Sequence, residues 1–314
     1  MKHRQALIHE VRGVLFRAGF KVSHQDIPPG LSFDVAAKRG DTILFIKVLS
    51  NIDAFQKESG YSLRKLADSI DASPLLVGER SGLGKLEYGV MYSRFGVPIM
   101  SLTTFKDFFL EDIPPLVFAA PGGFYVNLDK EVLWRARNER EISLGDLASI
   151  GGVSRKAIQM YCEGMSATVD VALRLEEYLG EELIVPINPI GYAKELPKIM
   201  EEYRKLGELD EDIFNHLRCL GYSVVPTVKC PFDALAQHDE ITMLAGVSRY
   251  DRVLVKRARV VKNVSNVIEK ESVMFVEHFR NRTDIEGLPL ISREELKRMK
   301  RPGKVIDLIY ERKG

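Results

Sequence analysis

The sequence of 314 residues contains an internal repeat, and this repeat limits the possible folds more than any other feature does. Four stretches from the first part of the chain return, in the same order and at similar separations, in the last part. The pairs are "LFRAGFKV" (15–22) with "LRCLGYSV" (217–224), "FDVAAKRGDTILFIKV" (33–48) with "FDALAQHDEITMLAGV" (232–247), "SPLLVGE" (73–79) with "SVMFVEH" (272–278), and "GVPIMS" (96–101) with "GLPLIS" (287–292). The pattern predicts two copies of one domain on either side of an unrelated segment.

Each copy has the sequence pattern of a small α/β domain. In the first copy we expect an amphipathic helix that ends at Gly19, a hairpin near Asp34, a strand at 43–48, a charged helix at 53–70, strands at 75–77 and 96–99, and a helix starting at "TTFKDFFL". The strand at 43–48 is apolar on both faces, which is typical of a central buried strand. This order predicts a mixed α/β sheet covered by helices.

The segment between the copies has a different pattern. "APGGFYVNLD" (120–129) supplies a chain break and a short strand, and Asp129 is a suitable N-cap. From there to Leu183 the pattern is helical, with Trp134 and Leu173 expected to pack inside, and "VPINPIGY" (185–192) ends it. The predicted domains are therefore 1–119 (α/β), 120–190 (all-α) and 191–314 (α/β).

Within the central segment, two short helices are joined by a tight turn. Ser143 caps the first helix, Gly151-Gly152 makes the turn, and Ser154 caps the second helix, "SRKAIQMYCEG". This layout is that of a helix-turn-helix, whose second helix inserts its first residues into the DNA major groove. Arginine can bind guanine O6/N7, glutamine can pair with adenine N6/N7, and a capped helix N-terminus attracts phosphate.

The stretch "LASIGGVSRKAIQMYCEG" resembles the Cro-like (phage-repressor) helix-turn-helix family. The matching positions are Leu147, Ala148, Gly152, Val153, Ser154, Ile158, Tyr161 and Gly164, and the departures are Glu141, Leu144, Gly151 and Cys162. The departures affect the first motif helix and leave the second intact. The DNA-binding residues that we expect are Ser143, Ser154, Arg155, Lys156, Gln159 and Met160. Solvation of an ordinary surface helix is the alternative role for Arg155 and Lys156.

The flanking copies resemble the PD-(D/E)xK nuclease fold, as in archaeal Holliday-junction resolvases. Glu10, Asp34 and Lys47 match its pattern, but Phe45 occupies the position of the second acid. Two carboxylates are needed to hold a hard divalent cation and a water molecule, so we predict no catalytic residues and no metal site.

The second copy departs further, because Asp233 remains while Leu244 and Gly246 replace the acid and the lysine. Two alternatives stay open for the first copy. A displaced acid, Asp53 or Glu58, could restore a structure-selective nuclease, or Asp34 could simply cap its own turn.

The whole chain resembles a group of archaeal helix-turn-helix transcriptional regulators, through the phrases "TILFIKVLSNID", "ASPLLVGER", "AAPGGFYVN" and "ALRLEEYL". The resemblance implies a transcriptional regulator that binds double-stranded DNA, and we expect a homodimer. Coactivators with the same helical fold bridge basal transcription proteins, which is the alternative partner class.

Charge and composition add little to this prediction. The formal net charge is +1, so DNA contact must come from local basic clusters such as "RYDRVLVKRARVVK" (249–262) and "KRMKRPGK" (297–304), each of which is a solvated or a phosphate-facing surface. The three cysteines form no CxxC pair, and we expect no cofactor. With no apolar run long enough for a membrane helix and no signal peptide, the chain is expected to be cytoplasmic, with no membrane partner.

Overall fold

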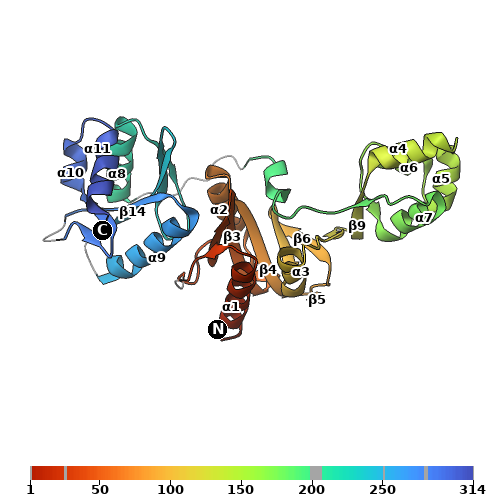
Figure 1. Ribbon diagram of the computed structural model, residues 1–314, viewed down its shortest axis with the longest axis horizontal. Helices are drawn as coiled ribbons and strands as arrows, with labels where there is room; N and C mark the ends of the chain where they lie inside the picture. Colours follow the sequence, from red (N-terminus) through yellow and green to blue (C-terminus); the bar gives the residue numbers. More distant parts are fainter. Residues whose placement is uncertain (1, 25–26, 199–206, 250–251, 279–281, 314) are drawn as a thin grey trace. The chain divides into compact units, whose positions relative to one another are not determined.

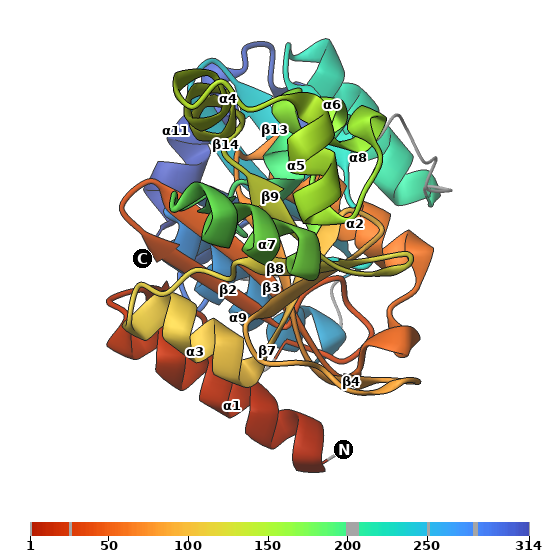
Figure 2. The same ribbon diagram turned by 90° about the vertical axis from the view of Figure 1, so that its right-hand side faces the viewer.

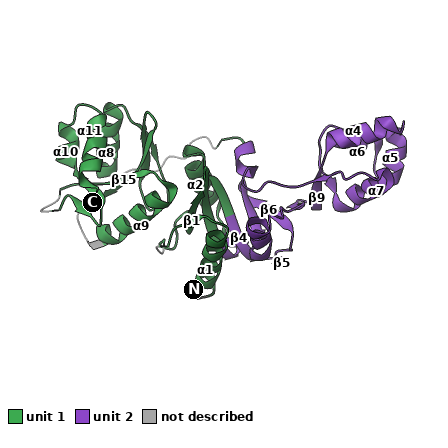
Figure 3. Ribbon diagram, viewed as in Figure 1, with its two compact units in different colours: residues 1–48, 55–75, 196–314 green, residues 49–54, 76–195 purple. Residues whose placement is uncertain are grey.

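A computed structural model describes residues 2–24, 27–198, 207–249, 252–278 and 282–313. By the density of their internal contacts, the residues form two compact units, coloured separately in Figure 3. One unit contains residues 1–48, 55–75 and 196–314, and the other contains residues 49–54 and 76–195. The units cut across the three expected segments, since the first α/β segment contributes to both.

The chain opens with helix α1 (Lys2–Arg17), which buries Val11, Val14 and Leu15. The helix ends as the sequence predicts: Gly19 has a φ of 80°, and the Phe20 amide donates back to the Leu15 carbonyl. Strands β1 (Lys21–Val22), β2 (Val35–Arg39) and β3 (Thr42–Asn51) then form an antiparallel meander. This meander holds the Asp34 and Lys47 positions of the first copy.

The rest of the first α/β segment continues the same sheet. Its elements are η1 (Ile52–Ala54), α2 (Lys57–Ser69), β4 (Ser73–Ser81), β5 (Gly84–Lys85), β6 (Val90–Arg94), β7 (Val97–Ser101) and α3 (Leu102–Leu110). The strand order is β1-β2-β3-β4-β7-β6, with β4 and β7 parallel. The helix expected at 53–70 begins only at Lys57, because a 3-10 turn at 52–54 precedes it.

The central segment forms four helices joined to a small antiparallel ribbon (Figure 1). The ribbon strands are β8 (Val117–Ala120), β9 (Gly123–Leu128), β10 (Ala167–Thr168) and β11 (Ile184–Val185), and β9 pairs with the other three. The helices are α4 (Lys130–Glu139), α5 (Leu144–Gly151), α6 (Arg155–Cys162) and α7 (Val169–Leu179). The short strand β10 interrupts the purely helical pattern that we expected, and the 3-10 turn η2 (Tyr192–Glu195) follows the ribbon.

Two apolar side chains of the central segment are not where the sequence placed them. Trp134 on α4 is 57% exposed and Leu173 on α7 is 51% exposed, so the prediction that they pack inside was wrong. The core is formed instead by their helical neighbours, Leu133 and Ala136 on α4 and Leu175 on α7. An apolar residue beside a buried stripe cannot be assigned to the core by spacing alone.

The last segment follows the main element order of the first, with one additional helix at its end and, among the described residues, without counterparts of η1 and β5. It consists of α8 (Glu208–Cys219), β12 (Ser223–Pro226), β13 (Ala234–His238), β14 (Ile241–Ser248), α9 (Arg252–Ile268), β15 (Glu271–Val276), β16 (Asp284–Ile285), β17 (Leu288–Ser292), α10 (Arg293–Arg298) and α11 (Gly303–Arg312). The strand order β12-β13-β14-β15-β17-β16 matches, strand for strand, the β1-β2-β3-β4-β7-β6 part of the first sheet, which continues from β6 into β8. Helices α8, α10 and α11 pack on one face of this sheet. Helix α9 contacts both this sheet and β2.

Candidate nucleic-acid interface and degenerate nuclease sites

The two helices of the predicted helix-turn-helix are closed at their ends by side-chain caps. The Ser143 hydroxyl accepts from the Asp146 amide while the Asp146 carboxylate accepts from the Ser143 amide, which makes a capping box at the start of α5. Gly152 ends α5 in the left-handed conformation, with a φ of 67°. The Ser154 hydroxyl accepts from the Ala157 amide at 3.1 Å and so fixes the start of α6.

The inner sides of α5 and α6 share one apolar core. Leu147 and Ala148 of α5 pack with Ile158 and Tyr161 of α6 in the cluster that also contains the α7 residues. Gly151 stands where the Cro-like family has a leucine, and a Cβ there would lie 3.3 Å from Val153 and 3.5 Å from Val171. Those two valines therefore occupy the space of the missing leucine, so this departure leaves the packing of the motif intact.

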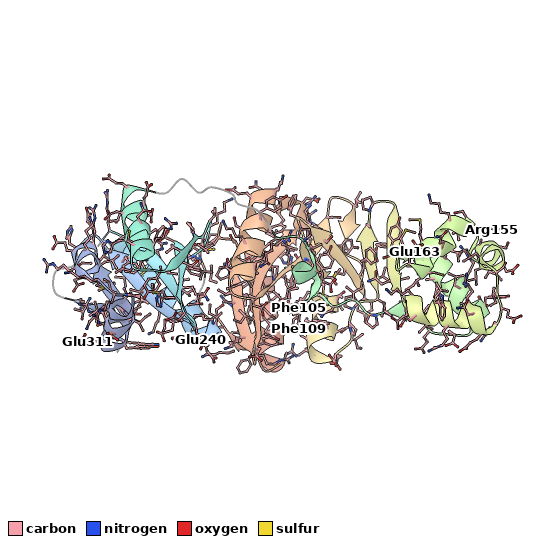
Figure 4. All side chains as sticks on the ribbon, turned by 90° about the horizontal axis from the view of Figure 1, so that it is seen from above. Phe105, Phe109, Arg155, Glu163, Glu240 and Glu311 are labelled. Atoms are coloured by element: carbon pink, nitrogen blue, oxygen red, sulfur yellow. The ribbon has the colours of Figure 1, made fainter. Side chains whose placement is uncertain are left out.

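The outer side of α6 presents the predicted DNA-binding residues to solvent. Arg155, Lys156, Gln159 and Met160 are all exposed, as is the capping Ser154. Figure 2 turns α5 and α6 toward the reader, and Figure 4 labels Arg155 and Glu163. The structure brings these five residues together on one surface. Ser143, the sixth predicted residue, is exposed at the start of α5.

Two of these side chains have neighbours that bear on their use. The Arg155 guanidinium lies over Gly145, whose hypothetical Cβ would be 3.0 Å from Nη2, so any larger residue at 145 would displace the arginine. Gln159 donates from Nε2 to the Glu163 carboxylate at 3.1 Å. Gln159 must leave this bond before its amide can pair with a base.

The helical segment is not basic as a whole. Between Lys130 and Val185, seven lysines and arginines stand against ten aspartates and glutamates. Arg174 is used internally, since its Nη2 donates to the Gly151 carbonyl at 2.7 Å. Any attraction for phosphate must therefore come from a few cations near α6, such as Arg155 and Lys156, rather than from a broad positive field.

In the first α/β segment, the aspartate of the nuclease pattern is buried and paired with cations. Asp34 is 2% exposed, and its carboxylate accepts from the Val48 amide at 2.8 Å and from Arg4 Nη2 at 2.6 Å. Lys47 Nζ lies 3.4 Å from the same carboxylate. The contacts reach across to β3 and α1, so the suggestion that Asp34 caps its own turn was wrong. Burial lowers the pKa of Lys47, and the Asp34 charge partly opposes that shift.

The other acids that could help to hold a metal ion either form ion pairs with other residues or are absent from this site. Phe45 is fully buried, and its ring centroid is 4.7 Å from that of Phe33. Asp53 pairs with Arg94, and Glu58 pairs with Lys229. Glu10 lies exposed on α1. In the part of the chain that the structure describes, no group of three His, Cys, Asp or Glu side chains could hold a metal ion.

The corresponding aspartate of the last segment has a closely similar environment built from a different helix. Asp233 is 4% exposed and accepts from the Val247 amide at 2.7 Å, as Asp34 does from Val48. Its cationic partner is Arg257 of α9, whose guanidinium also donates to the carbonyls of Pro231 and Val247. In both segments an arginine side chain supplies the positive charge beside the aspartate. The sequence motifs did not indicate either arginine.

The lysine position of the second copy is closed. A Cβ on Gly246 would overlap the sulfur of Met274, so the methionine fills the space that a lysine would need. The β13–β14 register places Ala234 opposite Ala245, so Gly246 lies opposite Asp233 just as Lys47 lies opposite Asp34. The alignment of the two stretches made from the sequence therefore matches the strand register.

Three of the six basic residues in the cluster at 249–262 form contacts within the fold. Arg257 pairs with Asp233, Arg259 makes a bidentate pair with Glu286, and Lys262 Nζ donates to the Gly287 carbonyl. Residues 250–251 of this cluster lie outside the described residues. In the second cluster, Lys297 pairs with Asp212.

These observations define a helix-turn-helix protein of the transcription-regulator class that also carries a nuclease-like α/β domain. Residues 135–184 match the helix-turn-helix family model, and residues 4–115 match that of the PD-(D/E)XK superfamily domain. No solved structure matches the chain. In the residues described, no helix is both long and apolar enough to cross a membrane.

Three archaeal relatives show the particular family. The proteins of Natronomonas pharaonis, Methanococcoides burtonii and Methanocella arvoryzae are 40%, 41% and 38% identical, and each alignment covers 98% of this chain and at least 97% of the relative. Each is named "Putative HTH-type transcriptional regulatory protein", in the first case followed by a locus label. The chain belongs to this family of archaeal HTH-type transcriptional regulatory proteins, as its resemblance predicted.

Proposed function

We propose that the chain is a sequence-specific DNA-binding transcriptional regulator in which α6 enters the major groove as a homodimer binds paired half-sites. The observation that carries this proposal is the row of exposed polar residues on α6, from the Ser154 cap to Gln159, opposite a buried side formed by Ile158 and Tyr161. A helix fixed on one side and polar on the other can approach base edges without losing its packing.

In this proposal the side chains of α6 have separate tasks. Arg155 would bind guanine, Gln159 would bind adenine after releasing Glu163, and Lys156 would meet phosphate. The helix N-terminus at Ser154 adds a favourable site for a phosphate oxygen. Ser143 and Met160 lie at the edge of this surface, where they can contact the DNA backbone or a thymine methyl group.

We further propose that residues 1–119 and 191–314 are two copies of a nuclease-like domain that have lost catalysis and flank the segment 120–190. Three observations support this: the equal strand orders, the equivalent positions of Asp34 and Asp233, and the replacement of the second acid by Phe45 and Leu244. An aspartate neutralised by an internal arginine has little capacity left for a divalent cation.

A protein-bridging coactivator is the second candidate function. The excess of acidic residues between Lys130 and Val185 favours it, because the general attraction to DNA is then weak. The Gln159–Glu163 bond points the same way, since it satisfies the glutamine without DNA.

The deciding experiment is selection of bound sequences from random duplex DNA by the full-length chain. We expect an enriched motif of paired half-sites about one helical turn, roughly 34 Å, apart or a multiple of it. Arg155→Ala or Gln159→Ala should weaken binding to that motif by about 1–3 kcal/mol and relax base preference, and Lys156→Ala should weaken all sequences alike.

Arg135→Ala is the matched control, because Arg135 is an exposed arginine on α4. Equal binding by the control and the α6 variants, together with no enriched motif, would favour the coactivator instead. A strictly monomeric chain at working concentration would contradict the half-site model.

A further inference from the structure

A cavity of about 590 Å³ lies where the first and last α/β segments meet, within the unit formed by residues 1–48, 55–75 and 196–314. The loop before β2 contributes Pro28 and Leu31, the loop before β13 contributes Pro231, and α9 contributes Val253 and Val260. The walls are therefore largely apolar. The volume falls in the range of small-molecule sites in proteins, about 300–1,000 Å³.

Hydrogen bonds between and around the two loops hold these walls in place. The Ser32 amide donates to the Lys229 carbonyl at 2.6 Å, and its hydroxyl donates to the Val228 carbonyl at 3.0 Å. Lys47, the lysine of the first degenerate site, donates to the Leu31 carbonyl. Arg257, the arginine of the second, donates to the Pro231 carbonyl at 2.7 Å. Both degenerate sites thus brace the cavity, which is formed before any ligand enters.

The charged side chains among the described residues that line the cavity are of one sign. Lys256, Arg257 and Arg259 line it together with His24, and among the described residues that line it none is acidic. Arg257 is neutralised by Asp233 and Arg259 by Glu286. Lys256 is exposed and forms no ion pair with any residue that the structure describes. Within the described ranges, Lys256 therefore contributes a positive charge without an acidic partner at the rim of an apolar space.

We propose that this cavity binds a small organic anion with an apolar body, such as a medium-chain or aromatic monocarboxylate. The carboxylate would pair with Lys256, and the hydrocarbon would lie against Leu31, Pro231 and Val260. The charge fixes the orientation and the apolar walls supply most of the affinity. This site lies outside the helix-turn-helix, so ligand binding there does not require that α6 binds DNA.

The test is calorimetric titration of the full-length chain with octanoate and, separately, with octanol. For a ligand of this size we expect a Kd for octanoate on the order of 0.1 mM, with weaker binding of the neutral alcohol. Lys256→Gln should raise the Kd for octanoate about fivefold, since an exposed ion pair contributes at most about a factor of that size to the affinity. The Kd for octanol should stay unchanged. Lys85→Gln, at an exposed lysine that does not line the cavity, is the matched control and should bind as the parent does.

A second variant tests the location of the site without endangering the fold. Val253 is 65% exposed, so Val253→Asp should fold normally while adding a carboxylate at the rim that repels octanoate. Arg155→Ala should bind octanoate as the parent does, which separates this proposal from the proposed role of α6. No octanoate binding at millimolar concentration, equal affinity for octanoate and octanol, or equal effects of Lys256→Gln and Lys85→Gln would overturn the proposal.

Discussion

Replacing Arg257 by methionine should remove the main support of a buried carboxylate. Asp233 is 4% exposed, and without the guanidinium it keeps the hydrogen bond from the Val247 amide at 2.7 Å but loses the positive charge beside it. The Pro231 and Val247 carbonyls lose a donor at the same time. Methionine keeps most of the side-chain length and has similar helix propensity, so the change isolates the loss of charge and hydrogen bonds.

The size of the effect follows from the burial. Breaking a buried ion pair by removing one partner costs about 3–5 kcal/mol, because the other charge stays in a medium of low dielectric constant. Arg4→Met should cost about 1–3 kcal/mol, because Asp34 keeps Lys47 at 3.4 Å as well as the Val48 amide. The difference between the two variants is the informative quantity.

The assay is urea unfolding followed by far-ultraviolet circular dichroism and by tryptophan fluorescence. Trp134 is the single tryptophan and lies on α4, so its fluorescence should not follow the transition of the last segment, whereas circular dichroism should. The double variant Asp233→Asn with Arg257→Met should recover most of the lost stability, since no buried charge remains. Equal stability of Arg257→Met and the parent, or a double variant less stable than Arg257→Met, would refute this reasoning.

With magnesium or manganese, the chain should leave duplex, flap and four-way DNA uncut, and cleavage that disappears in Asp34→Ala would contradict the proposed loss of catalysis. Burial raises the pKa of Tyr222 from 10.0 to about 12. The folded state therefore favours the neutral phenol, and this contribution to stability, about 2–3 kcal/mol, is present below pH 10 and is lost as the pH rises from 10 to 12. Tyr222→Phe should remove that pH dependence from the free energy of unfolding, measured by urea unfolding at each pH. Gly246→Ala should destabilise by about 1–3 kcal/mol through overlap with Met274, and adding Met274→Ala should relieve part of this cost, both measured by urea unfolding.

Much of the fold could be predicted because local patterns and the global arrangement agree. The repeat fixed the correspondence of Asp34 with Asp233, and alternating apolar positions with capping residues located α5 and α6. Exposure of Arg155 and Gln159 also followed from helical spacing, since Ile158 and Tyr161 take the buried side.

The features that were missed depend on contacts between distant parts of the chain. Arg4 and Arg257 lie on different helices at positions that no nuclease motif includes, so their meeting with the aspartates could not be inferred from spacing. The cavity requires two loops 200 residues apart, at Leu31 and Pro231. The exposure of Trp134 likewise reflects which neighbours cover α4, a property of tertiary packing rather than of periodicity.

The arginines beside the two aspartates also restrict the evolutionary routes open to this chain. Metal-dependent catalysis at this site would need an acid at position 45 and the departure of Arg4. If the acid comes first, a charged group replaces an apolar side chain that packs against Phe33; if the arginine leaves first, Asp34 loses its closest partner. Each single step would therefore lower stability before the site could hold a metal ion, so the two changes would have to occur together.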